Sequence, residues 1–183
     1  MEIKKIKIGS FANLISKKCN VPDAKNVYGI DINKQFIATK ANMSEIDTSR
    51  YNVVPPDSFA ANFMHIGRDE IIPVALNSTV YDLIVSPAYF VFEVTKSIIL
   101  SKYFYMIMSS SEFDRYAWFC TDSSVRGNLD WDRFCEIEVT LPSIPVQEKY
   151  ADVYNAITRN ANLRARASNI CPVLVKGALG DSP

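Results

Sequence analysis

His65 is the residue best suited to acid–base chemistry, and it is the only histidine in a chain of 183 residues. It could serve as the base for a serine or cysteine nucleophile, because imidazole exchanges a proton near physiological pH. Such catalysis also needs a nucleophile and an orienting group at fixed positions around the ring. With Met64 and Gly67 beside it, His65 fits a packed or ligand-contacting residue better than a catalytic base.

Sequence motifs for cofactor, phosphate or metal chemistry are missing. The chain has no Gly-x-Gly-x-x-Gly run, no P-loop and no His-Glu-x-x-His pattern. The run Val54-Pro55-Pro56-Asp57 has the two prolines of an amine-methyltransferase turn, but not the polar residue before them or the aromatic residue after them. The four cysteines include no Cys-x-x-Cys pair, so we expect reduced thiols rather than disulfides or a zinc site. We therefore predict a chain that is not an enzyme and uses no cofactor or metal.

A second kind of chemistry, the reading of base edges in DNA, suits the polar residues of the expected loops. Asn and Gln pair with adenine, and Arg and Lys pair with guanine. Arg68 and Arg126 are the strongest candidates, because each adjoins a glycine that lets the backbone approach a partner. Every candidate could instead be an ordinary solvated turn residue. The full set is Asn33, Lys34, Thr39, Lys40, Asn42, Asn62, His65, Arg68, Ser123, Ser124, Arg126 and Asn128.

Composition and charge set limits on these interpretations. With 48% apolar and 22% charged residues, the chain is long enough for one buried core with an appendage. The net charge of zero argues mildly against DNA binding, which usually needs a basic balance. The charge is unevenly distributed, however, because residues 1–20 are rich in lysine and residues 112–138 are rich in acids. One basic face is therefore compatible with the zero sum.

Short strands and a few helices must position the candidate loops. Alternating apolar residues predict strands at 3–8, at 84–92 and at 134–141, a hairpin over 27–37 with its tip in solvent, and two strands around the prolines at 55–56. Apolar residues at helical spacing predict helices after Ser10, over 97–107 and over 113–119. Pro142 and Pro145 should end the last strand.

A long helix is expected to follow, from about residue 146 to 170, with Pro172 and Gly177 breaking it. Its apolar face could close the core of the domain, or could pair with the same helix of a second copy. That face consists of Val146, Tyr150, Val153, Tyr154 and Ile157. The expected fold is thus an α/β or α+β domain over residues 1–145, with a twisted mixed sheet backed by helices. A helical spacer or dimerisation segment over 146–171 and a tail over 172–183 complete the chain.

Three motifs, in order, carry a family resemblance. The first is the run 51–57, which reads Tyr-Asn-Val-Val-Pro-Pro-Asp. The second is Val85-Ser86-Pro87-Ala88-Tyr89, continued by Val91 and Phe92. The third is Ser123-x-x-Arg126-Gly127, followed by a strand and by Leu141-Pro142-x-x-x-x-Gln147. Together they resemble the specificity subunit of type I restriction-modification systems over residues 3–170, with one recognition unit in place of the two of the usual subunit.

This resemblance implies a DNA target-recognition domain followed by a spacer helix. It implies a non-catalytic subunit that reads one half of a bipartite DNA site and directs separate methyltransferase and restriction subunits. A homodimer through the last helix would supply the second recognition unit. Two other interpretations stay open, a recognition domain detached from a larger fused restriction enzyme, and a protein-interaction module that has lost DNA binding. We also expect a cytoplasmic location, because no long apolar run or signal segment is present.

Overall fold

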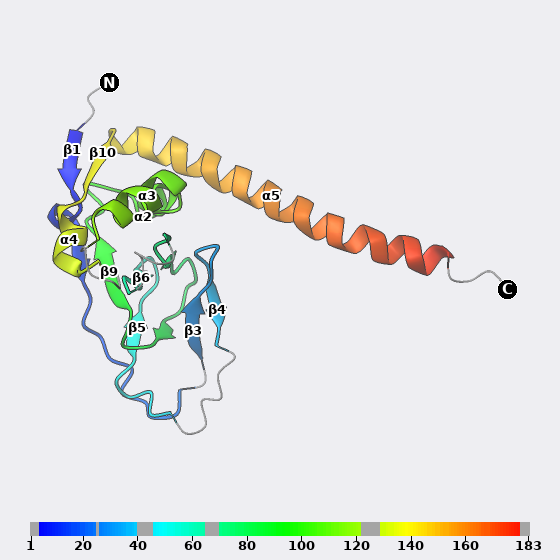
Figure 1. The fold of residues 1–183 in the computed structure, drawn as a ribbon, viewed down its shortest axis with the longest axis horizontal. Helices are drawn as coiled ribbons and strands as arrows, with labels where there is room; N and C mark the ends of the chain where they lie inside the picture. Colours follow the sequence, from blue (N-terminus) through cyan, green and yellow to red (C-terminus); the bar gives the residue numbers. More distant parts are fainter. Residues whose placement is uncertain (1–3, 25, 40–45, 65–69, 122–128, 180–183) are drawn as a thin grey trace.

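The computed structural model describes residues 4–24, 26–39, 46–64, 70–121 and 129–179. Its strands form two four-stranded sheets and one two-stranded sheet. The first sheet has the order β2(Ala12–Leu14), β9(Phe90–Val94), β6(Phe59–Ala61), β7(Val74–Leu76). The second has the order β4(Phe36–Ala38), β3(Val27–Ile30), β8(Leu83–Val85), β5(Asn52–Val54), and the third pairs β1(Lys4–Lys7) with β10(Glu138–Leu141). Figure 1 shows β1 and β10 beside the start of the long C-terminal helix.

The second sheet is mixed, as predicted. Strands β3 and β8 run parallel, whereas β3–β4 and β5–β8 are antiparallel. The predicted hairpin over 27–37 is the β3–β4 pair. Its turn is held by Asp31, whose carboxylate accepts from the backbone N–H groups of Asn33 and Gln35, and Lys34 adopts a left-handed φ of 60°. An Asx turn of this kind is a local signal, which is why the sequence predicts the hairpin.

Four α-helices and one short 3-10 helix accompany the sheets in the described residues. They are η1(Ile8–Ser10), α2(Ser101–Met108), α3(Ser111–Phe119), α4(Trp131–Glu136) and α5(Ile144–Leu179). Ser110 begins α3 because its hydroxyl accepts from the N–H of Phe113, and Asp130 begins α4 by accepting from the N–H of Arg133. The mixed α+β architecture agrees with the predicted fold class.

The core divides into two clusters where the sequence predicts one. The larger lies between the β2–β9–β6–β7 sheet and the helices, and the smaller involves β8 and the inner faces of β5, β6 and β9. Phe59 stacks on Phe92 at a centroid distance of 5.1 Å, and both are fully buried. Burial of each such ring stabilises the fold by roughly 1.5–3 kcal/mol. The strands of this sheet are therefore a rigid base for the loops that leave it.

Five predicted elements differ from the structure. The strand predicted over 84–92 is two strands, β8 and β9, which belong to different sheets because a turn over 86–89 separates them. Residues 12–14 form β2 rather than a helix, because they complete the sheet by pairing with β9. The helix expected from Ser97 begins at Ser101, after a turn. Residues 134–136 belong to α4, because the Asp130 cap starts a helix before the strand. The long helix continues past Pro172 to Leu179, since one proline removes a single hydrogen bond from a helix of 36 residues.

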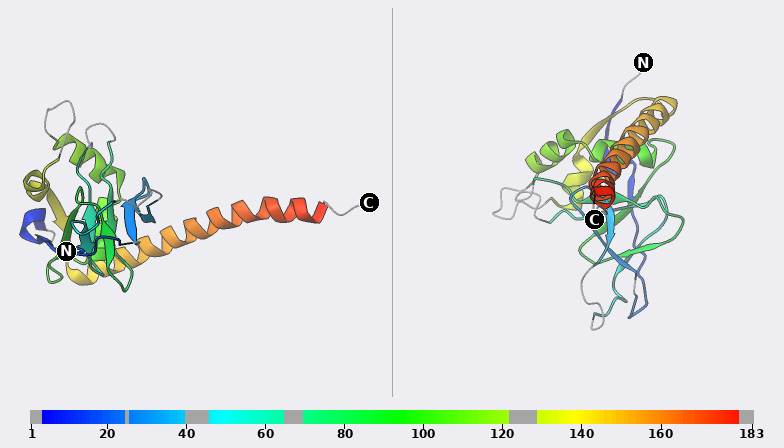
Figure 2. Two further views of the ribbon diagram at one scale, coloured as in Figure 1. Left: turned by 90° about the horizontal axis from the view of Figure 1, so that it is seen from below. Right: turned by 90° about the vertical axis from the view of Figure 1, so that its right-hand side faces the viewer.

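The exit direction of α5 is fixed by Gln147, which is 1% exposed. Its carboxamide nitrogen donates to the carbonyl oxygens of Ile98 and Pro142 at 3.1 and 2.9 Å. Its oxygen accepts from the N–H of Leu100 at 3.0 Å. Gln147 thus connects the first turns of α5 to the residues that immediately precede α2. From this anchor α5 runs along one side of the domain and extends well beyond it (Figures 1 and 2).

Candidate nucleic-acid interface

Half of the DNA-reading candidates lie in two segments, and the described residues at one end of each segment meet. Phe63 precedes the first segment, residues 65–69, and Leu129 follows the second, residues 122–128. The N–H of Leu129 donates to the carbonyl oxygen of Phe63 at 3.3 Å. The two segments that carry Gly-Arg and Arg-Gly pairs therefore share a root, although they are far apart in sequence. His65, Arg68, Ser124, Arg126 and Asn128 lie in these segments, and Lys40 in 40–45, all outside the described residues.

An aromatic layer supports this root. Phe63 lies 5.2 Å from Phe90 and 4.7 Å from Phe134, measured between ring centroids. Trp131, at the start of α4, stacks on Phe90 at 5.9 Å. Phe63 and Phe134 are almost completely buried. Because these rings belong to β9, to α4 and to the chain after β6, they hold the ends of both segments against the main sheet.

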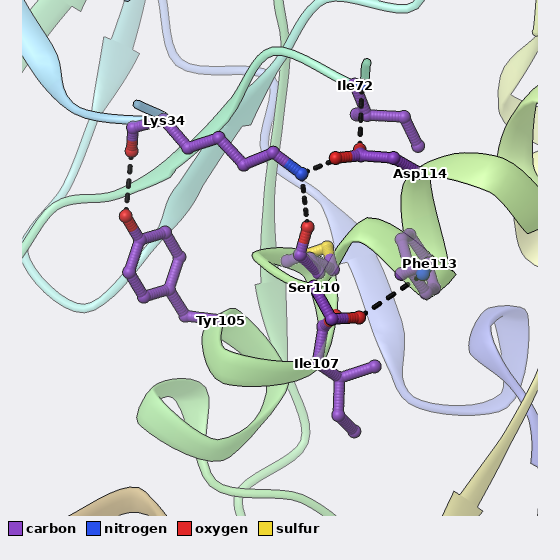
Figure 3. A network of polar contacts seen from close by, with 8 residues as sticks. Lys34, Ile72, Tyr105, Ile107, Ser110, Phe113 and Asp114 are labelled. Atoms are coloured by element: carbon purple, nitrogen blue, oxygen red, sulfur yellow. Dashed lines mark hydrogen bonds and ion pairs between the residues drawn. The ribbon is translucent and has the colours of Figure 1, made fainter. Parts of the chain in front are cut away.

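A buried ion pair forms the second support (Figure 3). The ammonium of Lys34 contacts the Asp114 carboxylate at 2.7 Å and the Met108 carbonyl oxygen at 2.5 Å. The same carboxylate oxygen of Asp114 accepts from the N–H of Ile72 at 3.0 Å. Asp114 therefore connects the β3–β4 turn, helix α3 and the chain that follows residues 65–69. Loss of hydration lowers the pKa of Lys34 from its ordinary 10.5, and the hydrogen bond and charge of Asp114 counteract part of that shift.

The prediction that Lys34 reads DNA is corrected by this geometry. Lys34 is 5% exposed, and its Nζ atom points into the interior. The turn between β3 and β4 is thus not wholly in solvent, because it packs against α2 and α3. Tyr105 of α2 reinforces the contact by donating its hydroxyl hydrogen to the Lys34 carbonyl oxygen at 2.8 Å. Burial raises the pKa of Tyr105, with smaller contributions from its neighbours, so the hydroxyl stays protonated and able to donate.

Asn62 lies at the edge of the shared root. Its side-chain oxygen accepts from the N–H of Met64 at 2.9 Å, and its own N–H donates to Pro73. The side chain is half-buried, and its amide hydrogens meet no acceptor among the described residues. Asn62 can therefore offer a donor, while its acceptor already closes a turn.

The predicted apolar face of α5 is largely open. Tyr150, Val153 and Ile157 are 53%, 58% and 63% exposed, and Val146 and Tyr154 are half-buried. The domain's own core is instead closed by Ala151 and Gln147 on a different side of the helix. Core closure therefore does not explain this face, which leaves the dimer hypothesis in place.

Sequence reasoning missed the roles of Asp114 and Gln147. Asp114 stands on a buried stripe with Phe113 and Ala117, and a carboxylate on an apolar stripe indicates a buried ion pair. Gln147 carried part of the family resemblance, but nothing in the sequence identified its three partners. The described residues contain no group of three His, Cys, Asp or Glu that could hold a metal ion. They also contain no helix that could cross a bilayer. Three cysteines, Cys19, Cys120 and Cys135, are free thiols and half-buried.

A comparison with solved structures places this fold among known ones. No family model matches the sequence, and no curated protein does. The structure superposes on an HsdS subunit from Thermoanaerobacter tengcongensis with a TM-score of 0.62 at 16% identity, covering 98% of this chain and 49% of that one. A type I restriction-modification S subunit from M. genitalium gives 0.56 at 15% identity, with 92% and 42% coverage.

A third similar structure, which concerns complex assembly and conformational transition of a type I restriction-modification system, gives 0.66 at 14% identity. It covers 97% of this chain and 48% of the other. The chain thus has the fold of type I specificity subunits and spans about half the length of each. The fold that the sequence motifs predict is confirmed.

Proposed function

We propose that this chain is a DNA-recognition subunit of a type I restriction-modification system. It reads one half of a bipartite site and directs separate methyltransferase and restriction subunits. The observation that carries the proposal is the fold, because one recognition domain and its long helix superpose on specificity subunits over 92–98% of this chain. The sequence motifs support it independently, since they occur in the order that the family has.

The shared root of residues 65–69 and 122–128 gives the proposal a chemical basis. Two arginines with glycine neighbours, Arg68 and Arg126, belong to segments whose ends are joined by the Phe63–Leu129 hydrogen bond. Arginine pairs with the O6 and N7 atoms of guanine, and Asn62 and Asn128 offer groups for adenine. Lys40, His65 and Ser124 complete the proposed set of base or phosphate contacts. Lys34 is left out of it, because its ammonium is buried.

A second copy would supply the other half-site. The open face of α5, formed by Val146, Tyr150, Val153, Tyr154 and Ile157, has the four-and-three spacing of a helix-pairing seam. Pairing two such faces would remove three half-exposed apolar side chains per chain from water. A symmetric dimer would then present two recognition domains to two separated half-sites.

The test is methylome sequencing of cells that produce this chain together with methyltransferase and restriction subunits. We expect methylated adenines in one bipartite sequence, with the same half-site on both sides of a fixed gap. The Arg68→Ala, Arg126→Ala double variant should lose or relax that sequence, while the Arg115→Ala variant on the exposed face of α3 should keep it. Methylation that needs no separate methyltransferase would favour a fused enzyme. An assembled complex without DNA binding at any salt concentration would favour a protein-interaction module and refute the proposal.

A further inference from the structure

A groove lies between α5 and the domain, and of the five residues of the proposed dimer face only Tyr154 lines it. Its volume is about 530 Å³, within the range of roughly 300–1,000 Å³ typical of ligand clefts. The domain wall comes from the β3–β4 turn, the end of β7 and α2, and the other wall is α5 itself. Three cations line the groove, Lys102 of α2 and Arg159 and Arg166 of α5, and the lining includes no carboxylate.

These cations are available to a ligand. All three residues are exposed, and none forms an ion pair with another residue in the described part of the chain. Asp152 lies seven residues before Arg159 on α5, about 10 Å away along the axis, and it does not line the groove. The groove is therefore a local positive surface on a chain whose net charge is zero.

Tyr154 lies at the boundary between this groove and the dimer face, whose other residues do not line the groove. Arg159 follows Tyr150 by nine residues, which is two and a half turns at about 3.6 residues per turn, so the two point to opposite sides. Asn155, Arg159, Asn162 and Arg166 repeat the four-three-four spacing along the groove side. A second α5 packed on Tyr150, Val153 and Ile157 would leave the groove open. The groove would therefore stay accessible to another ligand in such a dimer.

We infer that the groove holds a stretch of the DNA phosphate backbone, an inference that rests on the proposed function. The lining offers hydrogen-bond donors from two guanidiniums, an ammonium and the side-chain amides of Asn155 and Asn162. Phosphate oxygens are acceptors only, so they match this surface. The rings of Tyr105 and Tyr154 and the side chains of Leu76 and Leu163 complete the lining. The separation of Arg159 and Arg166, about 10.5 Å along the helix, is close to the rise of three nucleotides at about 3.4 Å each.

The groove contacts are independent of base sequence. They orient the duplex relative to α5, whereas the shared root of 65–69 and 122–128 reads the bases. A loss of groove contacts therefore weakens binding equally on every sequence and lowers its salt dependence.

The test measures binding of the full chain, in its complex with the methyltransferase subunit, to a random-sequence duplex of 30 base pairs between 50 and 200 mM KCl. The Arg159→Gln, Arg166→Gln variant should reduce the slope of log K against log salt by about 1.8, at about 0.9 per lost phosphate contact. Arg115→Gln is the control, because Arg115 is an exposed cation of α3 that lies neither in the groove nor on the dimer face. Its slope should equal that of the unmodified chain. Circular dichroism and the urea midpoint should be unchanged in all three proteins, because the substituted side chains are exposed.

Two results would overturn the inference while the proposed function stands. In the first, the unmodified complex binds DNA and the groove variant keeps its full salt slope. In the second, the Arg115 variant loses as much slope as one groove substitution, so that only the overall charge matters. If the groove variant instead loses the methyltransferase subunit in a pull-down with DNA binding intact, the groove docks protein and the inference is wrong. An unmodified complex that binds no DNA would overturn both proposals.

Discussion

The buried pair between Lys34 and Asp114 should control the stability of the whole domain. Substitution Asp114→Asn keeps an oxygen acceptor for the Lys34 ammonium and the Ile72 N–H but removes the negative charge. The side chains of Lys34 and Asp114 are only 6% and 13% exposed, so water cannot replace that charge. Breaking one partner of a buried pair lowers the free energy of unfolding by about 3–5 kcal/mol. Because the amide oxygen keeps both contacts, we expect a loss of about 3 kcal/mol.

Urea unfolding followed by circular dichroism, with linear extrapolation, measures this loss. The matched control is Glu112→Gln on the same helix, which removes an exposed ion pair with Arg115 whose side chains are 74% and 72% exposed. That substitution should change the free energy of unfolding by less than about 1 kcal/mol. Replacement of both buried partners, Lys34→Met with Asp114→Leu, should restore much of the stability, since the packed apolar pair leaves no unpaired charge.

The pH dependence provides a second readout. Burial lowers the pKa of Lys34 in the folded chain below the 10.5 of an unfolded lysine. Between those two values the unfolded state binds more protons, so the free energy of unfolding rises with pH through that window. This gain in the free energy of unfolding is complete above pH 10.5, and it is lost as the pH falls through the pKa of Lys34 in the folded chain. Without the Asp114 charge the folded pKa falls further, and the rise should begin at a lower pH. A cost under 1 kcal/mol for Asp114→Asn, with no such shift, would refute the reasoning.

Two further predictions concern α5. Substitution Gln147→Leu leaves the Leu100 N–H and two carbonyl oxygens without partners and should lower the free energy of unfolding by about 2 kcal/mol or more, whereas the exposed neighbour change Glu148→Gln should not, as urea unfolding would show. Substitution Ile157→Glu should convert a dimer into a monomer in sedimentation velocity, with Ala156→Glu as the exposed control. An unchanged sedimentation coefficient would remove the apolar face from the dimer proposal.

Local signals explain which parts of the fold the sequence predicts. The β3–β4 hairpin follows from the Asp31 turn, and β5 and β6 follow from the two prolines between them. Strand β2 escapes prediction because only its pairing with β9 makes residues 12–14 extended. A pairing between residues about 80 apart leaves no trace in the local pattern. Helix α4 is missed for a related reason, since its Asp130 cap precedes a run that alternates like a strand.

The same distinction between local signals and long-range contacts applies to the candidate site. Residue types suited to base reading are visible in the sequence, and they single out the segments around Arg68 and Arg126. The sequence does not reveal that the ends of those segments meet, because the Phe63–Leu129 bond joins positions 66 residues apart. Burial is equally hidden, as Lys34 shows. A lysine in a polar turn looks solvated until a carboxylate from another helix is placed against it.

The two supports of the root fix the described residues at the ends of both segments, so a change in one support should affect both. Asp114 fixes the chain that leaves residues 65–69, and α3, which carries it, leads directly into residues 122–128. The hydrogen bond between the Leu129 N–H and the Phe63 carbonyl oxygen joins the other ends of the two segments. Under the proposed function, a buried change at Asp114 should therefore weaken DNA binding through both segments, although the Asp114 side chain lies in the interior. An exposed change at one arginine should alter one contact only. The Asp114 change should lower DNA affinity on every sequence, because it loosens contacts that both segments share. The single-arginine change should lower only the preference for one base position.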